Sequence, residues 1–191
     1  MVNQLRPAVV MVALFTLLLG LAYPLGITGF AQVVFPAQAQ GSLIRDADGT
    51  VRGSTLIGQP FAEARYLHPR PSAAGDGYDA AASSGSNLGP LNTDLAARVA
   101  VDADALRGEA NGADIPADAV TTSASGLDPD VSPAYARLQA ARVATARGVA
   151  VEEVQAVIDA NTRQPLLGFI GQPRVNVLMT NRALDQRVPA A

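Results

Sequence analysis

The chain has 191 residues, 49% of them hydrophobic, a formal net charge of −3, one histidine, and neither cysteine nor lysine. These absences exclude several classes of protein, because a structural zinc site needs four nitrogen or sulfur ligands and a P-loop needs a lysine for the phosphates. A nucleic-acid-binding face needs clustered basic residues, whereas the arginines here are scattered.

Residues 8–31 contain no charged residue and no Asn, Gln, Ser or His. A helix of this length spans about 36 Å at 1.5 Å per residue, enough to cross a hydrocarbon core of about 30 Å with some tilt. The sequence therefore predicts a transmembrane helix at 8–31, preceded by a short cytoplasmic tail at 1–7 and followed by a linker at 32–41.

A cleaved signal peptide is the alternative, because Ala37-Gln38-Ala39 has the small-x-small form that a signal peptidase recognises. The uncharged run is longer than a signal h-region, which has about 7–15 residues, and we expect the helix to be retained as an anchor. Arg6 and the α-amino group favour a cytoplasmic N-terminus. Residues 42–191 would then form one extracytoplasmic domain.

Residues 42–57 predict a β-hairpin, with a tight turn at Asp46-Ala47-Asp48-Gly49. Residues 66–92 then lose all periodicity and are rich in Pro, Gly, Ser, Ala and Asn. Loops of this length are functional or disordered in most domains. We expect this loop to be ordered by a partner, because it offers little apolar surface of its own.

Asn92 is suited to cap a helix that Gly108 would end. Residues 119–122 predict a short strand. Ser132-Pro133 predicts the start of a helix that Gly148 ends. The apolar face of the first helix is expected to comprise Leu91, Leu95, Val99 and Leu106.

A further helix is expected at 151–160, with Val154, Val157 and Ile158 facing inward. Residues 174–185 fit a strand followed by a helix, although periodicity does not decide this. The fold class is therefore a single N-terminal transmembrane helix followed by one α+β soluble domain.

A serine hydrolase triad would have to use His68, and no Gly-x-Ser-x-Gly motif supports one. Asp128-Pro129-Asp130 lacks the further ligands of a calcium loop. Residues 83–87 would present hydroxyl and N–H groups either to an anion or partner, or simply to solvent. We expect no catalytic residue and no metal site.

Ten motifs follow one another in order between Arg6 and Val177 and together resemble one family. They are Arg6-Pro7, Tyr23-Pro24, Gly41-Ser42-Leu43-Ile44, Gly53-Ser54, Leu56-Ile57-Gly58-Gln59, His68-Pro69-Arg70-Pro71-Ser72-Ala73, Ser84-Gly85-Ser86-Asn87-Leu88-Gly89-Pro90, Thr122-Ser123-Ala124-Ser125-Gly126-Leu127-Asp128, Arg142-Val143-Ala144 and Gly171-Gln172-Pro173-Arg174-Val175-Asn176-Val177. The chain resembles the KdpC family, the C subunits of Kdp potassium-transporting ATPases. Arg182 departs from the apolar residue usual in the last segment.

The resemblance implies a bacterial plasma-membrane complex with a channel-like potassium-binding subunit and a P-type ATPase subunit. This chain lacks the Asp-Lys-Thr-Gly phosphorylation motif of the second and any Thr-Val-Gly-Tyr-Gly filter. The resemblance therefore implies an accessory, non-catalytic subunit that anchors and stabilises the other two in high-affinity, ATP-driven potassium uptake.

Two mechanisms are attached to this family. One is a catalytic chaperone that raises the ATP affinity of the pump subunit, with Gln139 at the position of a nucleotide contact. The other is an extracytoplasmic domain over the mouth of the channel-like subunit. No tightly bound cofactor is expected, and ATP would be met through the pump subunit. On its predicted amphipathic helix, Gln139 itself is expected to be a surface residue.

The partner interface is expected at small residues of the anchor, where close backbone approach is possible, and at motif residues of the domain. These residues are Gly20, Pro24, Gly26, Gly29, His68, Arg70, Ser86 and Asn87. Without the resemblance, the same features would also fit a membrane-anchored extracytoplasmic binding module for cell wall or a small solute.

Overall fold

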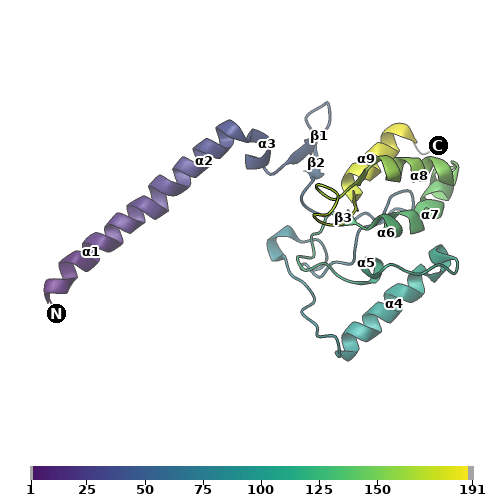
Figure 1. Ribbon diagram of the computed structural model, residues 1–191, viewed down its shortest axis with the longest axis horizontal. Helices are drawn as coiled ribbons and strands as arrows, with labels where there is room; N and C mark the ends of the chain where they lie inside the picture. Colours follow the sequence, from purple (N-terminus) through teal and green to yellow (C-terminus); the bar gives the residue numbers. More distant parts are fainter. Residues whose placement is uncertain (1, 189–191) are drawn as a thin grey trace. The chain divides into compact units, whose positions relative to one another are not determined.

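The computed structural model describes residues 2–188, and the chain divides into two compact units (Figure 1). The first unit extends to Arg52 and the second begins at Gly53. Each unit is described separately.

The first unit is dominated by a continuous helix made of α1 (Val2–Leu17), the π-helical turn η1 (Leu18–Ala22) and α2 (Tyr23–Val34). Pro24 explains the π-helical turn, because proline lacks an N–H and its ring clashes with the carbonyl four residues earlier. The chain widens there, and Tyr23 donates its N–H to the Leu18 carbonyl, five residues back.

The helical stretch Asn3–Val34 is apolar, and its most hydrophobic part contains no buried residue. Among residues 2–188, no other helix is long and apolar enough to cross a membrane. Its length and composition fit the predicted transmembrane helix, which extends beyond residues 8–31 at both ends. The short helix α3 (Pro36–Ala39) follows.

The predicted hairpin is confirmed, with β1 (Leu43–Arg45) beside β2 (Val51–Ser54). Its turn is closed by the Asp46 N–H, which donates to the Thr50 carbonyl at 2.9 Å. The Arg52 Nε donates to the Asp46 carboxylate across the hairpin at 2.5 Å.

The second unit contains a small antiparallel sheet of order β3-β5-β4, formed by β3 (Asp130–Val131), β5 (Arg174–Asn176) and β4 (Thr162–Arg163). Val175 in the central strand lies opposite both Val131 and Thr162. Residues from three distant parts of the chain therefore meet at one fully buried valine.

Two helices, α6 (Pro133–Leu138) and α9 (Val177–Arg187), contact the central strand of this sheet. The helices α7 (Ala140–Arg147) and α8 (Val151–Ala160) pack against them and against each other (Figure 1). The predicted start is confirmed, because the Ser132 Oγ accepts the Tyr135 N–H at 3.0 Å. Gly148 ends α7 in the left-handed conformation, with φ 70°. The predicted single helix is nevertheless divided at Gln139.

The predicted cap of α4 (Thr93–Ala110) is also confirmed, since the Asn92 side chain accepts the N–H groups of the first turn. The helix ends at Asn111, which adopts a left-handed conformation, and not at Gly108. The assignment of Leu91 to the apolar face was wrong: it is 96% exposed, because it precedes the cap and lies outside the helical periodicity.

The strand predicted at 119–122 was wrong. Its first two residues lie in the helical turn α5 (Ala117–Val120), where Pro116 sets the entry and the Thr121 hydroxyl donates to the Ala117 carbonyl at 2.6 Å. Ala119 and Val120 are buried in the core.

The core of the second unit is formed by α5 to α9, β3 and β5, with Leu67 as the contribution of the irregular segment. The expected inward residues Val154, Val157 and Ile158 are buried. In α9, Leu184 is fully buried, so Arg182 does not prevent this last helix from packing.

Residues 66–92 contain one short 3-10 helix, η2 (Ala80–Ala82). Leu67 and Ala74 are nevertheless 0% exposed. The prediction that this loop depends on a partner for order was therefore wrong for its first half, which is held by the rest of the domain.

Candidate partner-binding surface

Two buried side-chain amides hold the extended segment at Leu67 and His68. The Asn181 Oδ1 accepts the Leu67 N–H at 2.8 Å, and its Nδ2 donates to the Leu67 carbonyl at 3.0 Å. The Gln139 Oε1 accepts the His68 N–H at 2.7 Å, and its Nε2 donates to the His68 carbonyl at 3.1 Å. Each amide thus satisfies both backbone groups of one residue, as a neighbouring strand would.

The expectation that Gln139 is a surface residue was wrong, because the residue is 1% exposed. Its Oε1 also accepts a hydrogen bond from the Arg142 Nη2 at 2.7 Å. A carbonyl oxygen has two lone pairs, and both are therefore used within the domain. Gln139 lies where α6 and α7 meet, and the segment at His68 covers its side chain. The residue is therefore buried although the helical periodicity placed it at the surface.

Arg142 extends this attachment toward the start of the segment. Its Nη1 donates to the carbonyls of Ala64 and Tyr66 at 2.6 and 3.0 Å, and its Nε pairs with the Glu109 carboxylate at 3.0 Å. One guanidinium therefore joins α7, α4 and the irregular segment.

Arg147 makes a second buried attachment. Its side chain is 0% exposed and donates to the carbonyls of Arg65 and Val188, both at 2.8 Å. It also pairs with the Asp185 carboxylate at 2.9 Å, and its guanidinium lies 5.4 Å from the centroid of the Tyr66 ring. The planar guanidinium suits this set of acceptors.

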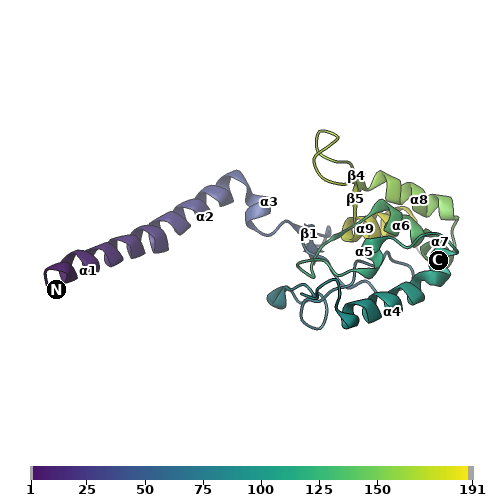
Figure 2. The ribbon, with the colours of Figure 1, turned by 60° about the horizontal axis from the view of Figure 1, so that its bottom comes forward.

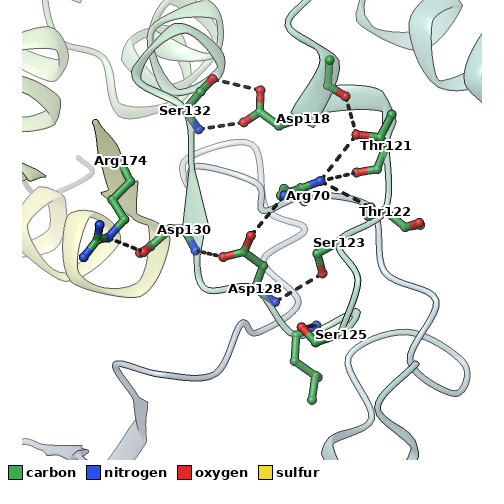
Figure 3. A network of polar contacts seen from close by, with 12 residues as sticks. Arg70, Asp118, Thr121, Thr122, Ser123, Ser125, Asp128, Asp130, Ser132 and Arg174 are labelled. Atoms are coloured by element: carbon green, nitrogen blue, oxygen red, sulfur yellow. Dashed lines mark hydrogen bonds and ion pairs between the residues drawn. The ribbon is translucent and has the colours of Figure 1, made fainter. Parts of the chain in front are cut away.

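Arg70, expected at the partner interface, makes several polar contacts within the domain (Figure 3). Its Nη1 pairs with the Asp128 carboxylate at 3.1 Å, and its Nη2 donates to the carbonyls of Thr121 and Thr122 at 3.4 and 3.3 Å. The second Asp128 oxygen accepts the Asp130 N–H at 3.0 Å. The Asp128-Pro129-Asp130 pattern is thus a turn that receives an arginine.

The neighbouring Asp118 stabilises the start of α6 in the same region (Figure 3). Its carboxylate accepts the N–H and the hydroxyl of Ser132 at 2.7 and 2.9 Å. Asp130 pairs with Arg174 of β5 at 3.0 Å. The network therefore joins the loop before β3 to the sheet and to α6.

Ser72 folds the next part of the loop onto residues 123–127. Its hydroxyl donates to the Gly126 carbonyl at 2.7 Å and accepts the Tyr78 N–H at 2.9 Å. The Tyr78 hydroxyl donates to the Arg70 carbonyl. Burial raises the pKa of Tyr78 well above its usual value, so this hydroxyl stays protonated and continues to donate.

An open groove of about 490 Å³ lies beside this segment. Its lining includes His68, Arg70, Tyr78, Asp102, Leu106 and Tyr135. Burial lowers the pKa of His68, with the Arg142 charge as a further cause, and burial raises the pKa of Tyr135 to about 12. Near neutral pH the imidazole and both phenols are therefore uncharged, and Arg70 and Asp102 supply the charged groups of the lining.

Sequence reasoning identified His68 and Arg70 of this groove but missed Asp102 and Tyr135. The latter two belong to helices far away in the sequence, and no local motif connects them with the loop. The sequence predicted the helices that carry Asp102 and Tyr135, but not their position beside the loop.

Ser86 and Asn87 lie farther along the same loop, where the Ser84 N–H donates to the Ser125 carbonyl at 3.0 Å. Within residues 2–188 the side chains of Ser86 and Asn87 form no hydrogen bond, and Asn87 is exposed with φ 52°. These two polar side chains therefore remain available to a partner.

The interface residues predicted in the anchor belong to the other unit. Gly20 lies in the π-helical turn, and Pro24, Gly26 and Gly29 lie in α2. A Cβ built at Gly26 or Gly29 would meet no atom within 4 Å. The helix surface at these positions is open to close approach by another helix.

Comparison with known proteins decides the family. The chain matches the family described as KdpC, the c chain of the K⁺-transporting ATPase, over residues 5–186. The chain belongs to the KdpC family.

Relatives named "Potassium-transporting ATPase KdpC subunit" are similar over almost their whole length. The relative from Caulobacter vibrioides is 69% identical over 189 residues, covering 99% of this chain and 96% of the relative. Those from Beijerinckia indica and Rhodospirillum rubrum are 61% and 53% identical, covering 99% and 100% of this chain and 96% and 100% of the relatives. The chain is therefore a KdpC-type subunit of a potassium-transporting ATPase complex, and the resemblance read from its motifs is confirmed.

Proposed function

We propose that this KdpC-family chain is an accessory, non-catalytic subunit that anchors and stabilises the channel-like and P-type ATPase subunits of a high-affinity potassium uptake complex in the bacterial plasma membrane. The observation that carries this proposal is a combination of two features. One is a helix whose uncharged stretch is long enough to span a membrane, and the other is a domain whose buried polar side chains bind its own backbone. Family membership favours this function over a binding module for cell wall or a small solute.

The charge of the N-terminal tail favours one orientation of the chain in the membrane. Arg6 precedes the uncharged stretch, and positive charge close to a membrane helix favours the cytoplasmic side. A large domain translocates largely regardless of its own charge. The domain would then be extracytoplasmic, over the mouth of the channel-like subunit and away from cytosolic ATP.

A catalytic-chaperone effect on ATP would then be indirect. The Gln139 oxygen already accepts two hydrogen bonds inside the domain, so we assign this residue to holding the segment at His68. Any increase in ATP affinity would arise because the subunit binds one conformation of the pump better than another. No tightly bound cofactor is needed for this role.

Cysteine labelling in intact cells tests the orientation, because the chain has no cysteine of its own. Ala113 is exposed and is preferred to Asn111, whose left-handed backbone and helix-capping position make substitution costly. We expect a membrane-impermeant maleimide to label Ala113→Cys in intact cells. Asn3→Cys is the matched control and should react only after lysis. The reverse pattern would place the domain in the cytoplasm, where it could meet ATP directly, and would contradict the proposed orientation.

Co-purification tests the anchor as a partner-binding helix. Gly20→Leu and Gly29→Leu place bulk where close helix approach is proposed, and both should reduce recovery of the two larger subunits. Leu19→Ala, which removes bulk at an exposed position, is the control and should leave recovery unchanged. Wild-type recovery with both leucine variants would mean that the anchor contacts its partners elsewhere.

N-terminal sequencing of the membrane-bound protein tests whether the anchor is retained. A chain beginning at Gln40 would show that the helix is a cleaved signal peptide.

A further inference from the structure

The loop between β4 and β5 exposes an apolar tip. The residues between Arg163 and Arg174 carry no charge, and we call residues 164–173 the hairpin tip. Its large side chains are strongly exposed: Leu166 66%, Leu167 75%, Phe169 75% and Ile170 50%. Figure 2 shows this loop projecting beyond the helices of the domain. Four such side chains in five residues make a concentrated apolar surface.

The backbone of the hairpin tip makes four hydrogen bonds within the tip. Leu166 and Ile170 exchange N–H to carbonyl bonds at 3.0 and 2.9 Å, the Gly168 N–H donates to the Pro165 carbonyl at 3.1 Å, and the Phe169 N–H donates to the Leu166 carbonyl at 3.3 Å. A backbone group without a partner is very unfavourable in a medium that lacks water. This closed pattern lets the tip enter an apolar medium without exposing many unpaired groups to it.

The conformation of Leu167 is a second unusual feature. Its φ is 55°, a left-handed conformation that glycine or asparagine normally occupies. A leucine there brings backbone strain, and at 75% exposure it contributes little packing within the domain. Burial of the Leu167 side chain against a surface outside the chain would offset the backbone strain and the exposure of its apolar area.

The size and the boundaries of the hairpin tip favour lipid as that surface. The four side chains expose on the order of 500 Å² when each is counted at roughly the size of a buried aromatic side chain, whereas a stable protein interface needs about 800 Å² on each partner. The exposed Arg163 forms no ion pair within residues 2–188. Arg174 lies at the other edge, where it pairs with Asp130 and its side chain is 46% exposed. Arginines at the boundary of an apolar segment suit anionic lipid headgroups.

We propose that the hairpin tip inserts into the headgroup and acyl boundary of the bilayer in which the anchor is embedded. The proposal rests on the proposed retention of the anchor, which keeps the domain at high effective concentration near lipid. A weak, reversible insertion then suffices to restrict the orientation of the domain. This second membrane contact is distinct from the anchor and from the groove beside His68.

Depth-dependent quenching in the full chain tests this proposal. Phe169→Cys carries an environment-sensitive fluorophore, and the protein is reconstituted into phosphatidylcholine and phosphatidylglycerol vesicles with or without brominated acyl chains. We expect a blue-shifted emission and about twofold quenching by brominated lipid, because interfacial segments lie roughly 5–10 Å into the boundary. Val101→Cys, at an exposed apolar position of α4, is the matched control and should remain unquenched.

Several results would overturn the proposal. Equal quenching at both positions would indicate nonspecific adsorption, and no quenching at position 169 would exclude insertion. Shielding that appears only after assembly with the larger subunits, without quenching by brominated lipid, would assign the hairpin tip to a protein partner. Addition of Leu167→Asp should abolish quenching at position 169 while circular dichroism stays unchanged. Flotation with vesicles separately reports whether the anchor is embedded, so failure of the anchor and failure of the tip are distinguishable.

Discussion

Two regions of the domain reach a fixed structure in different ways. The pair α7 and α8 buries apolar side chains at helical spacing and satisfies its backbone within each helix. Residues 66–78 lack regular secondary structure, and side chains from other elements bind their backbone. An irregular segment can thus be as fixed as a helix when buried amides and guanidinium groups replace the missing ladder. Variants that each remove one attachment test how much these side chains contribute to the stability of residues 66–78.

The largest effect is expected for Asn181→Ala. The substitution leaves the buried N–H and carbonyl of Leu67 without partners, each at about 1–3 kcal/mol, so the free energy of unfolding should fall by about 4 kcal/mol in all. Urea denaturation of the full chain in detergent, followed by circular dichroism, measures this. Asn161→Ala is the control, because that amide bonds only within the end of α8 and should cost about 1 kcal/mol. Equal losses would show that the amide at Leu67 has no special role.

The second-largest loss in the free energy of unfolding is expected for Gly126→Ala. A Cβ at Gly126 would lie 2.6 Å from the Ala74 nitrogen and 2.7 Å from the Ser84 carbonyl oxygen, at φ 68°. Gly148 has nearly the same φ, 70°, but no atom within 4 Å of such a Cβ. Both variants bear the left-handed strain of about 1–2 kcal/mol, and only Gly126→Ala should lose a further ~2 kcal/mol from the clash. Hydrogen exchange near Ala74 should rise in that variant alone, and an unchanged pattern would contradict the close crossing.

Arg70→Lys should give a smaller loss. Lysine cannot reproduce the planar set of donors that reaches Asp128 and the carbonyls of Thr121 and Thr122, and we expect a loss of about 1–2 kcal/mol. Arg137→Lys is the matched control, because its pair with Asp159 is exposed and such pairs contribute about 0–1 kcal/mol. Chemical denaturation of the two variants side by side makes the comparison, and equal stabilities would contradict it.

The smallest effect is a pH dependence from His68. Burial, with the Arg142 charge as a second cause, holds its pKa in the folded state below the unfolded value of 6.5. The unfolded chain therefore binds the proton more readily, and stability should fall as the pH drops through 6.5 and below. Water screens this partly exposed ring, so the effect is modest. His68→Gln should flatten the dependence between about pH 7.5 and pH 5.5, and an identical slope in both proteins would contradict it.

The same contrast explains what could be predicted from the sequence. Caps and stops are local signals, so Asn92, Ser132 and Gly148 marked helix ends correctly. The attachments of residues 66–78 depend on Gln139 and Asn181, which lie far away in the sequence, and periodicity carries no information about such pairs. Gln139 was therefore expected at the surface although it is buried.

The α5 region shows a second physical limit. Residues 119–122 have strand-like composition, yet Ala119 and Val120 lie in a helical turn because Pro116 sets its start and the core buries both side chains. Tertiary packing overrides a weak local preference in so short a segment. The position of the groove was equally inaccessible, because its walls come from α4, α6 and the irregular segment.

The attachments of Arg147 have a mechanical consequence. One guanidinium joins the Arg65 carbonyl, near the beginning of the domain, to the Val188 carbonyl, near its end. Tension entering along the chain from the membrane side would reach this link before it reached the helices that follow. Because three acceptors share one rigid group, the link has to break in several places at once under tension. If the anchor is retained as proposed, this link opposes unravelling of the domain from its membrane-anchored end.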